Sequence, residues 1–136
     1  TLPDGSLAYS AEKIKSIEND ITAHNRLQYK INKMQWYDDN AINTFTKLVN
    51  LLKKQYNILF VLVPYNPKVW NFKELPILKA MEIVEFKVHE LAKNLKVNVV
   101  GSYNAQKIGC REDEFHDAMH PKSSCLVKLE SVMKLY

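Results

Sequence analysis

Apolar residues along the chain follow helical spacing in some segments and strand-like spacing in others. From Ser10 onward they recur at steps of three to six residues, which predicts a helix with an incomplete apolar stripe. A second helix is predicted to begin at Asp38 or Asp39. The expected inward positions are Ile14, Ile17, Ile21, Leu27 and Ile31 in the first helix, and Ile42, Phe45, Leu48, Val49 and Leu52 in the second.

The middle of the chain predicts a strand–helix–strand unit. NILFVLVP at 57–64 is apolar on both faces, as in a central parallel strand. Residues 73–95 form the clearest helix, and VNVVGSY at 97–103 reads as a second strand, so a parallel crossover is expected. The stripe of the 73–95 helix is Ile77, Met81, Val84, Val88, Leu91 and Leu95.

The end of the chain predicts a polar loop at 104–121 followed by a helix at 122–135. Leu126, Leu129, Val132 and Met133 are expected to face inward from that helix. The whole pattern indicates one α/β domain over residues 1–136, with a parallel sheet flanked by helices in a three-layer, flavodoxin-like arrangement.

The predicted sheet has only two strands, which is few for an open parallel sheet. The chain also begins at Thr1 with TLPDGSLAYS and no initiator Met. We therefore expect an N-terminally truncated domain, in which an upstream segment or a partner chain completes the sheet.

Composition narrows the classes of ligand. The net charge of +4 comes from 19 basic residues spread along the chain, with no run longer than Lys53-Lys54, so nucleic-acid binding is not expected. Three glycines in 136 residues match no phosphate-binding loop, and no cofactor is expected. No apolar run reaches membrane length, so this segment is not expected to contact a membrane.

Ligands of open parallel sheets bind beyond the carboxyl ends of the strands. Here those ends lead into PYNP and into the loop that ends in HDAMHP. Tyr65 and Asn66 directly follow the first strand, and we predict that they contact substrate. Other aromatic residues either line a sugar-binding cleft or belong to the core; they are Trp36, Tyr37, Trp70 and Phe72.

The stretch DEFHDAMHPKSS at 113–124 admits two chemical interpretations. His116 and His120, four residues apart, could bind a metal together with Asp117. Alternatively, Asp117 accepts a hydrogen bond from Nδ1 of His120, which leaves Nε2 free to act as a general base. Pro121 disfavours helical spacing of the two histidines and stiffens the loop that holds His120, so the second interpretation is preferred.

Cys110 and Cys125 lie on either side of this loop. Two cysteines alone do not make a zinc site. They predict either one disulfide in an exported protein or two buried thiols in a cytosolic one, and their position around one loop favours the disulfide.

The D-x-x-H-P pattern after the last predicted strand resembles the final motif block of the SGNH (GDSL-type) hydrolase superfamily. ILFVLVPYNP and VNVVGSYNAQKIGCREDEFHDAMHP are similar to the elements around that block, most of all in the DltD-like and alginate O-acetylation-like branch. The resemblance covers residues 57–136 well and 1–56 loosely. It implies that Asp117 and His120 are the catalytic acid–base pair of a serine esterase or O-acyltransferase.

The substrates implied by this resemblance are acyl esters of carbohydrate or cell-envelope polymer, in the periplasm or another extracytoplasmic compartment. The family's Gly-Asp-Ser block, which carries the nucleophile, has no equivalent in this chain. DGSL at 4–7 has another order, so Ser6 reads as a loop residue, and ENDI at 18–21 lacks the glycine of a further family block. We expect the nucleophile upstream of Thr1; the alternatives are a non-catalytic binding or assembly domain on the same fold, or a chance resemblance.

Overall fold

The computed structural model describes residues 10–12, 15, 38–71 and 76–133. Strands β1 (Leu59–Leu62) and β2 (Asn98–Gly101) pair in parallel, with Leu59 opposite Asn98 and Leu62 opposite Gly101. The pairing is extended by an isolated parallel bridge between Tyr65 and Asn104. The chain therefore has an α/β fold with a two-stranded parallel sheet, as its apolar pattern predicted.

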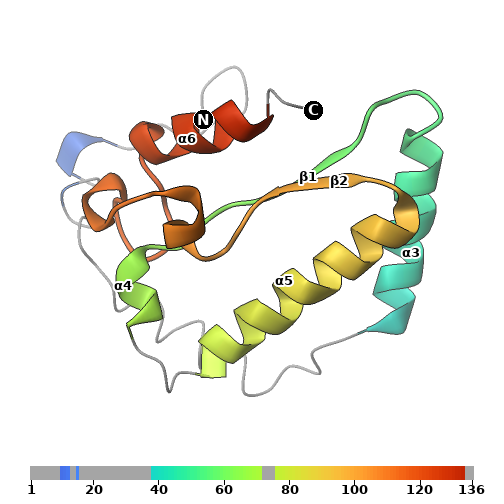
Figure 1. Cartoon of the computed structure of the whole chain (residues 1–136), viewed down its shortest axis with the longest axis horizontal. Coiled ribbons are helices and arrows are strands. Elements are labelled where there is room, and N and C mark those ends of the chain that lie inside the picture. Colours follow the sequence, from blue (N-terminus) through green and yellow to red (C-terminus); the bar gives the residue numbers. More distant parts are fainter. Residues whose placement is uncertain (1–9, 13–14, 16–37, 72–75, 134–136) are drawn as a thin grey trace.

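Helices cover the strand pair from both sides (Figure 1). Helix α5 (Pro76–Leu95) forms the crossover from β1 to β2, and α6 (Ser123–Met133) lies on the opposite side of the strands. Helix α3 (Asp39–Leu52) precedes β1 and packs near the carboxyl end of α5. Short elements fill the loops: α4 (Pro67–Trp70), η1 (Ala105–Ile108) and η2 (Glu112–Glu114).

The buried apolar residues that the structure describes include three small clusters. One joins α3 to the end of α5 through Val49, Leu95 and Val97, with Phe60 of β1 packed against it. A second lies at the carboxyl edge of the sheet and contains Val69, Leu78, Met81 and Ala118. The third surrounds the two cysteines and contains Ala105, Cys110, Phe115 and Cys125.

Gly101 permits the close approach of β1, β2 and α6. Its φ is +85°, and a Cβ at this position would lie 2.2 Å from the carbonyl oxygen of Leu62 and 2.9 Å from Cδ1 of Leu129. Only glycine adopts this left-handed backbone conformation without strain and has no Cβ to collide with these atoms. The end of β2 is thereby turned toward the loop that carries the candidate site.

Several predicted inward positions are wrong. In α3 only Val49 is buried, whereas Phe45 is 43% and Leu48 49% exposed, and Leu52 is also exposed. In α6 the buried residues are Cys125 and Leu129, whereas Leu126 and Val132 are exposed. Helix α3 buries one side chain and α6 buries two, so the apolar stripe overstates how much of each helix is covered.

The first strand also differs from the prediction of a strand buried on both faces. Val61 is 37% and Val63 43% exposed, while Leu62 between them is buried. The expected first-helix stripe from Ile14 to Ile31, and the residues Ser6, Trp36, Tyr37 and Phe72, lie outside the described residues. Among the residues that are described, no helix is long and apolar enough to span a bilayer.

Candidate acid–base site

Asp117 and His120 form a hydrogen-bonded pair at the carboxyl edge of the sheet. Oδ2 of Asp117 lies 2.6 Å from Nδ1 of His120. The Asp117 side chain is 8% exposed, whereas the His120 side chain is 60% exposed. The carboxylate is thus held inside the protein while the imidazole reaches solvent, which is the geometry a general base needs.

The backbone of the loop fixes the carboxylate through its other oxygen. Oδ1 of Asp117 accepts hydrogen bonds from the backbone N–H of Met119 at 2.7 Å and of His120 at 2.8 Å. An Asp in such a turn bonds the backbone two and three residues ahead of it. One oxygen shapes the turn, and the second orients the imidazole.

The ends of the turn are clamped to each other. The backbone N–H of His116 donates to the carbonyl of His120 at 2.9 Å, and Phe115 bridges to Pro121 in antiparallel fashion. Pro121 fixes its own φ and restricts His120 to extended conformations. Residues 115–121 therefore form a closed miniature hairpin, with the exposed His120 in its second arm beside Pro121.

Electrostatics keep Asp117 ionised. Burial raises the pKa of the Asp117 carboxyl, but the hydrogen bonds from the Met119 N–H and from His120 outweigh it, so the pKa lies below the usual value. A carboxylate that remains charged is a strong acceptor for Nδ1 and fixes the orientation of the imidazole.

Asn66 ties this loop to the end of β1. Its backbone N–H donates to the carbonyl of Ala118 at 3.0 Å, and its side-chain Nδ2 donates to the carbonyl of Asp117 at 3.2 Å. Its Oδ1 caps α4 by accepting from the N–H of Lys68. Asn66 is 5% exposed, so the residue predicted to contact substrate has its side chain engaged in holding the loop.

Tyr65 lies beside Asn66 at the same edge. Its N–H donates to the carbonyl of Tyr103 at 2.9 Å, and the two rings meet edge to face with centroids 5.9 Å apart. Burial raises the pKa of the Tyr65 hydroxyl, so this group is neutral near neutral pH. The contact of Tyr65 with substrate stays a prediction.

A disulfide and a partly buried ion pair hold the loop from the side of α6. Cys110 and Cys125 are joined, with their Cα atoms 5.3 Å apart. Nζ of Lys128 lies 2.6 Å from Oε2 of Glu114, and the same oxygen accepts from the N–H of Arg111. These links fix both ends of the segment between the cysteines, which contains Asp117 and His120.

The residues of the metal alternative do not converge. Within the described ranges, no group of three or more His, Cys, Asp or Glu side chains could hold a metal ion. Nδ1 of His116 is buried and has no hydrogen-bond partner, while Nδ1 of His120 is engaged by Asp117. The geometry favours the acid–base pair over a metal centre.

Sequence reasoning missed Glu85. Its carboxylate accepts from Oγ of Ser102 at 2.9 Å, from the N–H of Tyr103 at 2.9 Å and from Nζ of Lys107 at 3.0 Å. Burial raises the pKa of Glu85, but the hydrogen bonds from these donors lower it by more, so the net shift is downward. A Glu within a helix gives no sequence signal, because its partners come from the turn after β2.

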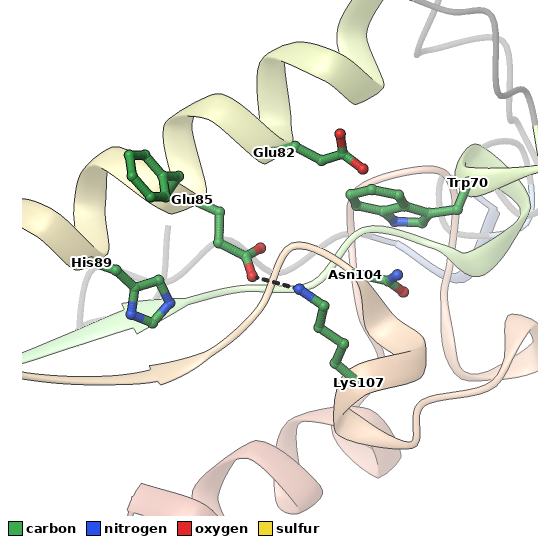
Figure 2. A pocket seen from close by; sticks show the side chains of 7 residues that line it. Trp70, Glu82, Glu85, His89, Asn104 and Lys107 are labelled. Carbon is green, nitrogen blue, oxygen red and sulfur yellow. Dashed lines mark hydrogen bonds and ion pairs between the residues drawn. The ribbon is translucent and has the colours of Figure 1, made fainter.

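Glu85 borders a cavity of about 410 Å³ between α5, α4 and η1 (Figure 2). Trp70 and Lys107 line it together with Glu82 and His89. Neither Asp117 nor His120 belongs to its lining. Trp70 and Met119 nevertheless pack on the same apolar cluster, so the cavity and the acid–base loop share one edge of the fold.

In the part of the chain that the structure describes, His120 makes its only side-chain hydrogen bond to Asp117. None of the hydrogen bonds among the described residues joins a serine hydroxyl to His120; Ser102 donates to Glu85, and Ser131 donates to the carbonyl of Val127. Nε2 of His120 is thus available to a nucleophile from elsewhere.

Comparison with protein-family models, curated proteins and solved structures found no match.

Proposed function

We propose that this domain carries the acid–base half of an SGNH-like serine esterase or O-acyltransferase, on an SGNH-type three-layer fold of which residues 1–136 are the C-terminal portion. The observation that carries the proposal is the 2.6 Å contact between Asp117 and His120, with the carboxylate buried and the imidazole exposed. The resemblance of the D-x-x-H-P block supports the assignment to the acid–base position.

The proposed chemistry is acyl transfer through a serine. A serine hydroxyl attacks the acyl carbon, and its proton moves to Nε2 of His120. When the tetrahedral intermediate collapses, His120 donates that proton to the leaving alkoxide. Water or a sugar hydroxyl then attacks the acyl-serine and gives its proton to His120, which returns it to the serine as the second intermediate collapses. Asp117 stays anionic and stabilises the imidazolium in both steps.

We propose acyl esters of carbohydrate or cell-envelope polymer as substrates, and a periplasmic or other extracytoplasmic location. The Cys110–Cys125 disulfide supports the location, because such bonds persist in oxidising compartments. No cofactor takes part in this scheme. The substrate class rests on the resemblance alone.

The nucleophile is proposed to come from an upstream segment or a partner chain. The exposed side chains of Val61 in β1 and of Val63 just after it support this, because a further element packed on this face would cover them. The same exposed residues support the second candidate function, a non-catalytic assembly domain that binds through β1.

Labelling with a fluorophosphonate probe tests the proposal. A serine activated by His120 is expected to become labelled in the longest natural form of the protein, and peptide mass spectrometry identifies it. His120→Ala should abolish labelling, and His116→Gln in the same loop should retain it. Absence of labelling in a natively folded wild type, or equal labelling in His120→Ala, would leave the assembly function as the better account.

A further inference from the structure

The cavity in Figure 2 is a candidate for a second binding site, separate from the acid–base pair. Its volume of about 410 Å³ falls within the range of small-ligand pockets. One wall is the face of α5 that presents Glu82, Glu85 and His89, and the opposite side is formed by the indole of Trp70 and by Lys107.

The charges of this lining do not balance. The Glu85 carboxylate is compensated by Lys107 at 3.0 Å and by two further donors. Glu82 is exposed and makes no hydrogen bond or ion pair with any described residue. Figure 2 shows its carboxylate directed toward the indole of Trp70. Beside the indole, the lining therefore presents a negative charge that no described cation compensates.

These two groups suit one ligand chemistry. The face of an indole carries partial negative charge and attracts C–H groups and cations, and tryptophan is the strongest such partner among the aromatic residues. A carboxylate beside it binds an ammonium group or a pair of hydroxyls. A ligand with a flat C–H face, several hydroxyls and a positive charge meets both conditions.

The cavity also continues along α5. A second hollow of about 330 Å³ shares Glu85, His89 and Lys107 with it and extends to Leu129 of α6. The two hollows adjoin at these shared residues, and we refer to them together as the groove. A groove of this form accommodates a short linear chain better than a single compact molecule.

We propose that this groove binds an amino-sugar oligosaccharide, with a sugar ring on the face of Trp70 and its ammonium group paired with Glu82. Acidic sugars are disfavoured, because their carboxylates would face Glu82, while Lys107 is already paired with Glu85. The inference does not depend on catalysis by His120, since no residue of the acid–base pair lines the groove.

An NMR titration of the 136-residue chain with a glucosamine oligosaccharide tests the inference. The ionic strength is kept at about 0.15 M, where long-range electrostatic attraction is screened. The Trp70 indole N–H signal, assigned with Trp70→Phe, is expected to shift on titration. Glu82→Gln should weaken binding about tenfold, the value of one charge-assisted pair. The matched control is Glu90→Gln on the same helix outside the groove, which should bind within about twofold of wild type.

His120→Ala is expected to bind as wild type does, which separates this site from the proposed acyl transfer. The fully N-acetylated oligosaccharide should bind about tenfold more weakly, because it lacks the ammonium group. The proposal would be overturned if a uronic-acid oligosaccharide bound with equal affinity, or if Glu82→Gln and Glu90→Gln had equal effects. Loss of binding in His120→Ala, or no shift of the Trp70 signal at millimolar ligand, would also overturn it.

Discussion

The side-chain amide of Asn66 donates to the backbone carbonyl of Asp117 at 3.2 Å, across 51 positions of sequence. This contact joins the end of β1 to the loop that follows β2. The position of the acid–base pair is thus set by the parallel strand pair and not by the loop alone.

Removal of this amide should loosen the loop. Asn66→Ala leaves the carbonyl of Asp117 and the N–H of Lys68 without their side-chain partners, at a cost of about 2–3 kcal/mol in the free energy of unfolding. Urea denaturation measures this cost. Asn71→Ala, at an exposed position near the end of α4, is the control and should cost less than about 0.5 kcal/mol. Equal costs for the two variants would show that Asn66 does not anchor the loop.

Two described glycines with positive φ should respond differently to alanine. A Cβ at Gly101 would meet the carbonyl oxygen of Leu62 at 2.2 Å, whereas a Cβ at Gly109 meets nothing within 4 Å. Gly109→Ala is expected to cost about 1–2 kcal/mol for the left-handed backbone alone. Gly101→Ala adds a clash with backbone and should cost at least about 2 kcal/mol more than Gly109→Ala. A comparison of thermal unfolding checks the difference; similar melting temperatures would contradict the tight packing at the end of β2.

The disulfide should contribute substantially to stability. It closes a loop over 15 positions, for which chain-entropy arguments give about 3 kcal/mol. Urea unfolding with and without reductant measures this contribution. The variant with both Cys110→Ala and Cys125→Ala serves as the control, since reductant should not alter its stability. A reductant effect of similar size in that variant would mean that the loss does not come from this bond.

Low pH should remove the contribution of Asp117. Because folding lowers the pKa of this carboxyl from its ordinary value of 3.8, its stabilising effect is fully present above that value and is lost as pH falls through the lower folded pKa. On acidification from about pH 5 to about pH 2, wild type should lose more stability than Asp117→Asn. Parallel curves for the two proteins would mean that Asp117 is not preferentially ionised in the fold.

The strand pair and its crossover could be predicted because their apolar runs are long and regular. The D-x-x-H-P block likewise indicated the pairing of Asp117 with His120, since residues three apart in a turn are brought together locally. Elements of three or four residues, such as α4 and η1, were missed because their caps, Asn66 and Asn104, look like ordinary loop residues. The bonds of Glu85 depend on which turn packs against α5, and local sequence does not contain that information.

The most direct test of the central claim is the rate of p-nitrophenyl acetate cleavage by the longest natural form of the protein. Wild type, His120→Ala, Asp117→Asn and the loop control His116→Gln are compared after circular dichroism has shown that all are folded. We predict that wild type and His116→Gln turn over, and that the other two lose at least about a hundredfold in kcat/KM. Turnover that is unchanged in His120→Ala, or absent from wild type, would contradict an acid–base role for the pair.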